Sequence, residues 1–165
     1  MRILGVDPGT RTTGYGILDF DGEAPRCIAW GVLHGGPSKE IAERLHLLHQ
    51  RLEEVFSDWS PDQLAIEEPF VSPQRGAKSG IAVGQAQAIA LLLAAHSKIP
   101  IYRYAPTTVK GSVSNYGAGT KAQVQRSVQI LLGLGDDAMS PDASDAIAIA
   151  LCHVQALRAA RITMR

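Results

Sequence analysis

The chain opens with the stretch Ile3-Leu4-Gly5-Val6-Asp7, followed by Pro8-Gly9-Thr10. A short apolar run that ends on a carboxylate is typical of a buried strand, and Pro-Gly is typical of a turn. Aspartate is a poor strand former, and burying its charge is costly unless the carboxylate has a partner. The sequence therefore predicts that Asp7 lies where the first strand leaves the core, next to turn amides, a cation or a metal.

The size and composition are typical of one globular domain, because the chain has 165 residues and is 45% apolar. We expect residues 1–165 to form a single domain. No apolar run is expected to be long enough to span a membrane, and the N-terminus has no signal-peptide pattern. The cysteines, Cys27 and Cys152, lack metal-binding or redox spacing. These features favour a reducing, cytoplasmic location and no membrane partner.

The charges sum to zero but are unevenly distributed along the chain. Residues 1–68 carry 6 basic and 12 acidic side chains, whereas residues 69–135 carry 7 basic side chains and no acidic one. An acid-free stretch of this length predicts a surface for a polyanion such as nucleic acid, and a chance bias on a solvated face is the alternative. Its basic residues are Arg75, Lys78, Lys98, Arg103, Lys110, Lys121 and Arg126.

Hydrophobic periodicity and turn residues predict an α/β fold. Strands are expected over residues 3–7, 13–20, 26–33, 63–67 and 99–104, the first three as an antiparallel meander. Helices are expected over residues 40–56, 80–97, 106–113, 121–132 and 141–160. Thr120 and Ser140 are the expected N-caps of the last two helices. His153, among apolar residues of the last helix, is expected to be packed rather than catalytic.

Four carboxylates lie at the ends of these predicted elements: Asp7 and Glu67 close strands, and Asp142 and Asp145 share one face of a helix start. Each alone has an ordinary explanation, such as complementing the helix macrodipole. If the first and fourth strands are neighbours, however, Asp7 and Glu67 meet at one sheet edge. Carboxylates about 4 Å apart repel each other by roughly 4 kcal/mol per pair. Such a cluster favours a hard cation, and oxygen-only ligands favour Mg²⁺ or Mn²⁺.

Three motifs, in order and spacing, resemble those of the RuvC-type crossover junction endodeoxyribonucleases, the bacterial Holliday junction resolvases. They are Ile3–Arg11 with Thr13–Gly16, then Ala65–Phe70, then Pro141–Ala150. The similarity covers nearly the whole chain. It implies a ribonuclease-H-like fold, with a five-stranded mixed sheet flanked by helices. It also implies a homodimeric endonuclease that resolves four-way DNA junctions by paired symmetric nicks, after delivery by a branch-migration complex of RuvA- and RuvB-type proteins.

The resemblance also implies roles for the four acids. Asp7, Glu67, Asp142 and Asp145 match the catalytic, metal-binding carboxylates, although the position of Asp142 can be His in the family. Two Mg²⁺ ions, with Mn²⁺ as a substitute, are expected in each active site. One ion is expected near Asp7 and Asp145, where it activates water, and the other near Asp7 and Glu67, where it stabilises the leaving 3′ oxygen. Glu68 is left out, because it would point to the opposite face of the strand.

The expected DNA-binding residues are Phe70, Arg75, Lys78, Lys110 and Lys121. Phe70 matches a family aromatic residue that stacks against bases at the junction, and base stacking contributes about 1–3 kcal/mol per base. Lys110 and Lys121 match family lysines near the DNA, where they would hold phosphates. The loop after Phe70 departs from the family pattern in length, so no sequence preference for cleavage is predicted.

Three other functions share some of these sequence features. A sugar-kinase or actin-like ATPase shares the Asp-x-Gly-Thr turn, but 165 residues leave no room for its second lobe. A junction-binding relative that does not cut is disfavoured by the intact set of four acids. A ribonuclease-H-like nuclease acting on another nucleic-acid structure has the same acids, and the matches of Phe70, Lys110 and Lys121 favour the junction enzyme.

The helix expected over residues 80–97 is rich in alanine and glycine, which allow close approach of another backbone. This pattern suggests a dimer contact. We therefore expect a bulky residue at Ala86 or Ala90 to disrupt the dimer.

Overall fold

The computed structural model describes residues 1–69, 76–113, 121–133 and 139–163, and of Lys121, Val124 and Leu131 only the backbone. Its five-stranded sheet has the order β3-β2-β1-β4-β5. The strands are β1 (Arg2–Asp7), β2 (Thr12–Phe20), β3 (Pro25–His34), β4 (Gln63–Glu67) and β5 (Ile101–Tyr104). The first three form the predicted antiparallel meander, whereas β4 pairs in parallel with both β1 and β5. The prediction of a mixed sheet is confirmed.

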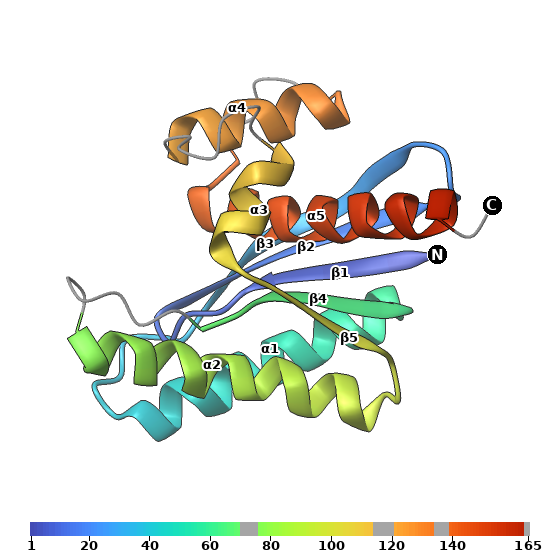
Figure 1. The fold of residues 1–165 in the computed structure, drawn as a ribbon. Helices are drawn as coiled ribbons and strands as arrows, with labels where there is room; N and C mark the ends of the chain where they lie inside the picture. Colours follow the sequence, from blue (N-terminus) through green and yellow to red (C-terminus); the bar gives the residue numbers. More distant parts are fainter. Residues whose placement is uncertain (70–75, 114–120, 134–138, 164–165) are drawn as a thin grey trace.

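Helices cover both faces of this sheet (Figure 1). One face carries α5 (Pro141–Thr163), with α3 (Pro106–Val113) and α4 (Lys121–Leu132) packed beyond it. The other face carries α1 (Ile41–Trp59) and α2 (Gly76–His96). Strand β1 serves both cores, because its residues alternate between the faces. Ile3 packs in the core on the α5 side, and Leu4 and Val6 pack with α1 and α2.

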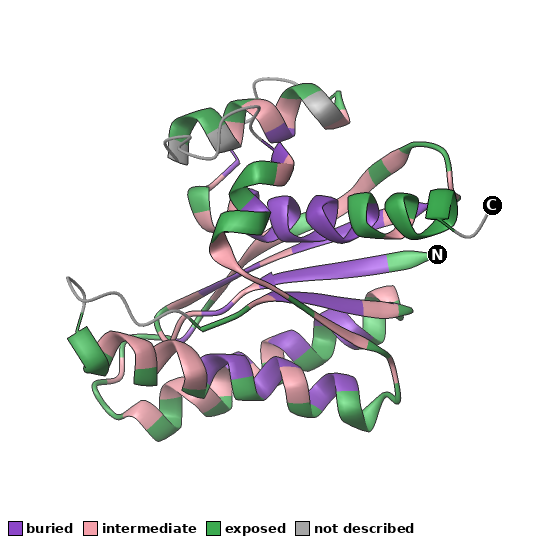
Figure 2. Cartoon of the chain, in the orientation of Figure 1, coloured by how far each residue is buried: buried purple, intermediate pink, exposed green. Residues whose placement is uncertain are grey.

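The first half of α5 is buried on nearly every side, as its purple colour in Figure 2 shows. It rests directly on the strands at positions that lack a side chain. A Cβ atom at Gly5 would lie 2.1 Å from the carbonyl oxygen of Ala146, and a Cβ atom at Gly16 would lie 2.5 Å from Cγ1 of Ile147. Glycine is therefore required at these positions so that the helix can approach the sheet this closely.

Most element boundaries follow the prediction, and α3 and α4 have the predicted limits. The predicted cap of α5 is confirmed, because the N–H of Ala143 donates a hydrogen bond to Oγ of Ser140 over 3.3 Å. The N-cap predicted at Thr120 lies outside the described residues. Helix α1 continues to Trp59 and ends at Ser60, which has a left-handed backbone.

The start predicted for α2 was wrong, because the helix begins at Gly76 rather than residue 80. Gly76 has a positive φ of 70°, which glycine adopts without strain, and the residues after it include good helix formers. The glycines of this segment had indicated a loop.

The expectation about membrane-spanning length also needs correction. Two helices, α2 and α5, are long and apolar enough to cross a membrane by length and composition. Alanine-rich helices meet this criterion although their side chains are small. In the most apolar window of α5, 50% of the residues are buried inside the protein, and in that of α2 33% are. Core helices of soluble proteins pass the same test.

The residues chosen to test a dimer contact on α2 were wrong. Ala86 and Ala90 are only 3% and 0% exposed, because they face the protein's own core. A bulky residue there would disturb the fold of one protomer. The outward face of α2 instead carries Ile81, which is 62% exposed, and Leu92, which is 66% exposed. The exposed residues Gln85 and Ala88 lie between them at helical spacing.

A buried polar network joins β4, β5 and α5 around His153, which is 1% exposed. Nδ1 of His153 lies 2.5 Å from the hydroxyl of Tyr104, and Nε2 lies 2.6 Å from Oε1 of Gln63. Burial raises the pKa of Tyr104 to about 12, so its hydroxyl keeps its proton and donates to Nδ1. The Nε2–H group then donates to Gln63. The prediction that His153 is packed is confirmed.

This network makes stability depend on pH. Burial lowers the pKa of His153 from its ordinary value of 6.5 to about 4. Between these values the unfolded chain binds a proton that the folded chain excludes, so the contribution is complete above about pH 6.5 and is lost as the pH falls toward 4. We expect the free energy of unfolding of the parent to fall over this range by about 2 kcal/mol more than that of His153→Gln. Urea denaturation at several pH values measures this difference.

The matched control is His46→Gln on α1, whose side chain is exposed. It should keep the pH dependence of the parent. An equal acid sensitivity in parent and His153→Gln would contradict the assignment of a neutral, buried imidazole.

The close packing of α5 gives a second prediction. Gly5→Ala should lower the free energy of unfolding by roughly 1–3 kcal/mol, because the new methyl group overlaps the carbonyl of Ala146 and the helix must move. Gly111→Ala is the control, since a Cβ atom there would have no neighbour within 4 Å. Alanine should be neutral there or stabilise α3 by up to about 1 kcal/mol. Equal effects of the two substitutions in urea denaturation would show that α5 is free to adjust.

Candidate active site

The ends of three strands form a row that crosses the sheet on its α5 side. Asp7 of β1 pairs with Gly14 of β2, and the parallel register of Val6 with Ile66 places Glu67 of β4 beside Asp7. Alternate residues of a strand share a face, so Asp7 lies on the same face as Gly5, which contacts α5. Asp7 and Glu67 therefore stand next to each other beneath the start of α5.

The start of α5 lies over this row. A Cβ atom at Gly14 would be only 2.0 Å from the carbonyl oxygen of Asp142, so the first turn of the helix touches the strand that pairs with Asp7. Asp145 follows three residues after Asp142 and lies on the same helix face. Both side chains are half-buried, as are those of Asp7 and Glu67. The fold thus brings all four predicted acids to one edge of the sheet.

The backbone around Glu67 is held from both sides. Nε2 of Gln87, a residue of α2 that is 5% exposed, donates to the carbonyl of Glu67 over 2.9 Å. The N–H of Glu68 donates to the carbonyl of Tyr104 over 2.8 Å. The adjacent Glu68 is exposed. Gln87 was not predicted from the sequence, although a single amide among alanines on the buried face of α2 was a usable signal, since buried polar groups need partners.

The turn after Asp7 is closed by Thr13, a residue of the first motif whose structural role was not predicted. Its hydroxyl donates to the carbonyl of Gly9 over 2.9 Å and accepts the N–H of Gly9 at 3.4 Å. A Cβ atom at Gly9 would lie 2.5 Å from the carbonyl oxygen of Thr12. The threonine hydroxyl and the glycine together fix where β1 ends, and hence where Asp7 stands.

The donor set suits a hard divalent cation, because carboxylate oxygens are the ligands that Mg²⁺ and Mn²⁺ prefer. The backbone positions of the four acids converge. Within the part of the chain that the structure describes, no three His, Cys, Asp or Glu side chains are grouped as metal ligands. Neighbouring carboxylates repel one another. We therefore expect these side chains to move closer to one another when a bound cation balances their charge.

The predicted DNA-binding residues are placed only in part. Lys78 lies near the start of α2, which follows β4 in the chain, and Lys110 lies on α3, which follows β5. Both side chains are exposed, and both helices begin at the carboxyl ends of the parallel strands, where the acids lie. Lys121 opens α4, but its side chain is not described. Phe70 and Arg75 lie outside the described residues.

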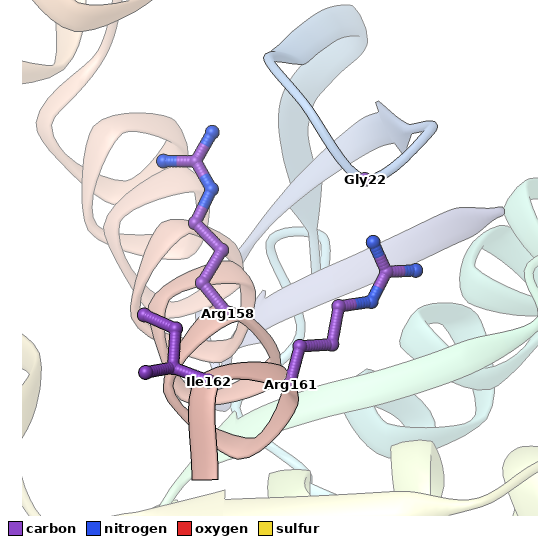
Figure 3. Close-up of a pocket in the computed structure, with 4 residues that line it drawn as sticks. All are labelled: Gly22, Arg158, Arg161 and Ile162. Atoms are coloured by element: carbon purple, nitrogen blue, oxygen red, sulfur yellow. The ribbon is translucent and has the colours of Figure 1, made fainter. Parts of the chain in front are cut away.

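A separate pocket lies at the other end of the strands, between the β2–β3 turn and the end of α5 (Figure 3). It has a volume of about 340 Å³ and is lined by Gly22, Arg158, Arg161 and Ile162. The guanidinium groups of Arg158 and Arg161 lie 5.6 and 5.8 Å from the centre of the Phe20 ring, and Arg158 also donates to the carbonyl of Glu23. These contacts attach the β2–β3 turn to the end of α5, far from the four acids.

Comparison with known proteins agrees with this arrangement. A family model described as crossover junction endodeoxyribonuclease RuvC matches residues 3–153. The RuvC protein of Bartonella bacilliformis is 42% identical over 153 residues, which cover 93% of this chain and 90% of that protein. The RuvC protein of Desulforamulus reducens is 41% identical over 155 residues, 94% of each chain.

The fold is also that of a solved member of the family. The structure of Thermus thermophilus RuvC in complex with a Holliday junction substrate superimposes with a TM-score of 0.86 at 30% identity, covering 97% of this chain and 96% of that one. This confirms the expected ribonuclease-H-like architecture. Because the family model spans most of the sequence and relatives of 41–42% identity align along nearly its whole length, the chain belongs to the RuvC family of crossover junction endodeoxyribonucleases.

Proposed function

We propose that residues 1–165 act as one nuclease domain that resolves four-way DNA junctions by paired symmetric nicks. Family membership makes the chain an endodeoxyribonuclease. The observation that carries the proposal is the row of Asp7 and Glu67 beneath the start of α5, where Asp142 touches Gly14. This row gathers carboxylate oxygens at one end of the strands, where each of the four acids is partly exposed.

The four acids would hold the metal ions. Asp7 would contribute to both ions, with Asp145 at one, Glu67 at the other, and Asp142 completing the set. When bound, two Mg²⁺ or Mn²⁺ ions would supply an activated water and would stabilise the charge on the leaving 3′ oxygen. The chain's own contribution is to position the acids: the turn closed by Thr13 fixes Asp7, and Gln87 fixes the strand end at Glu67.

The basic residues of the acid-free stretch would hold the DNA. We propose that Lys78 and Lys110, which lie on helices that begin at the same edge as the acids, contact phosphates of the cut strand. Arg75 and Lys121 would extend this contact, and Phe70 would stack against bases at the junction.

Paired nicks require two active sites, and each chain brings one set of four acids. We therefore propose a homodimer whose two-fold axis matches that of the junction. The outward face of α2, with Ile81 and Leu92, is the proposed contact because it exposes two large apolar side chains on one helix face. Delivery by a branch-migration complex of RuvA- and RuvB-type proteins, in the cytoplasm, completes the proposal.

The first test of this function uses mobile and immobile four-way junctions, each labelled on one strand at a time. With Mg²⁺ or Mn²⁺ we expect paired symmetric nicks, which stop when the metal is chelated. Asp7→Asn should cut at least about a hundredfold more slowly, because it removes a charge that both ions need. Glu68→Gln is the matched control and should cut within about twofold of the parent, because Glu68 is exposed beside the site.

The outcomes separate the remaining functions. Tight junction binding without nicks in either metal would indicate a non-cutting relative. Cleavage of other nucleic-acid structures in preference to the junction would indicate a different substrate. Equal losses in Asp7→Asn and Glu68→Gln would contradict the assignment of the four acids.

The dimer gives a separate prediction. Ile81→Asp combined with Leu92→Asp should convert a dimer into a monomer in light scattering, because charges would have to be buried at the contact. Ile130→Asp on α4 is the control, since that side chain is 67% exposed on another surface. A dimer that survives the double substitution would place the contact elsewhere.

A further inference from the structure

Basic residues outside the acid-free stretch lie around Gly35, which directly follows β3. We refer to Arg11, His34, Arg44 and Arg51 as the β3 basic cluster. The N–H of Gly35 donates to the carbonyl of Arg11 over 2.8 Å, and a Cβ atom at Gly35 would lie 3.2 Å from Cβ of Arg44. Arg51 donates to the carbonyl of His34. Three segments of the chain thus contribute to one local structure.

The sheet register places this cluster at the same edge as the four acids. His34 pairs with Thr12, two residues before Gly14 on β2, and Gly14 pairs with Asp7. Figure 1 shows that the loop after β3 and the start of α1 lie at the same end of the molecule as the ends of β1 and β4. The cluster lies on the α1 side of the acids, whereas α3 and α4, which carry Lys110 and Lys121, lie on the α5 side.

The arginines of the cluster keep their charge available. Arg44 donates to the carbonyl of Ser38 over 3.3 Å, and its buried Nε has no hydrogen-bond partner. Arg51 likewise donates to a carbonyl, that of His34. A guanidinium that is bound only to carbonyls retains its positive charge and spare donors, which suit a phosphate.

The charge order along α1 supports a role beyond helix stability. A helix is stabilised by bases near its C-terminus, yet the last turn of α1 has none, and Glu53, Glu54 and Asp58 lie in its second half. Arg44 lies in its first half, and Arg51 lies at its middle. Two acids also lie at the helix start, where they suit the macrodipole, and one of them, Glu43, is bound by the hydroxyl of Ser38.

We propose that the β3 basic cluster binds the phosphate backbone of a duplex arm of the DNA that the four acids cut. This inference rests on the proposed function and adds a second phosphate-binding surface to it. The DNA would then be held on both sides of the catalytic row, by the lysines that follow β4 and β5 and by the arginines beside β3. Contacts of this kind carry no base sequence information, so they position the junction without selecting the cleavage sequence.

The test compares two double variants that remove the same charge. Arg11→Gln with Arg44→Gln alters the cluster and keeps the Cβ atom of residue 44 that packs on Gly35. Arg158→Gln with Arg161→Gln alters the arginine pair at the other end of the strands (Figure 3). Affinity for a labelled four-way junction is measured by fluorescence anisotropy, with the metal chelated, between about 50 and 200 mM salt. Thermal unfolding verifies that each variant is folded.

We expect the plot of log affinity against log salt to become shallower by about 1 for each lost phosphate contact, hence by about 2 in the cluster variant. The loss should be the same for junctions of different sequence, and the control pair should behave as the parent. Arg11→Gln alone is the second variant: its side chain is exposed, so it should fold normally and lose about 1.

The failures of the two proposals are distinguishable. A parent protein that neither binds nor cuts the junction would contradict the proposed function. A parent that binds and cuts, with a cluster variant that keeps the parental salt slope or loses no more than the control pair, would overturn the phosphate surface alone.

Discussion

The structure depends on the close contact between α5 and the glycines of β1 and β2. At Gly5, Gly14 and Gly16 a side chain would overlap atoms of the helix, and at Gly14 the overlap is with the backbone of Asp142 itself. Because packed interiors adjust little, this contact sets the height and position of the helix start relative to Asp7. The same contact that builds the core on this face therefore determines where two of the four acids stand. The packing of α5 on these glycines therefore contributes both to the stability of the fold and to the geometry of the site.

The remaining two acids are positioned by hydrogen bonds to the backbone. Thr13 closes the turn after Asp7, and Gln87 binds the carbonyl of Glu67 from a helix on the opposite side of the sheet. Both groups are buried polar side chains, and a buried polar group is tolerated only with a partner, so each has one favourable position. His153 acts similarly farther along the sheet, where it joins the start of β4 to the end of β5. These residues support the site without belonging to it.

The distribution of charged residues in the folded protein differs from their distribution along the sequence. The acid-free stretch contains lysines on α2 and α3, two helices that begin at the carboxyl ends of the parallel strands. The N-terminal part has an excess of acids, yet it brings Arg11 and Arg44 together at that same edge through Gly35. Three acids of α1, Glu53, Glu54 and Asp58, lie in its second half, toward the other end of the helix. A net charge summed over the sequence hides this difference, whereas in the folded protein Arg11 and Arg44 lie at one end of α1 and these acids lie toward the other end.

The sequence by itself determined the strand order along the chain, the turn after Asp7, the cap at Ser140 and the candidate acids, because these depend on local periodicity and on residues with restricted backbone preferences. It also carried the three motifs that identify the family. Only the tertiary structure decided that α2 begins at Gly76, that Ala86 and Ala90 face inward, and that Gln87 and the arginines around Gly35 belong to this edge. Those features depend on contacts between residues far apart in the chain, and neither propensity nor spacing reports which distant backbone a side chain will meet.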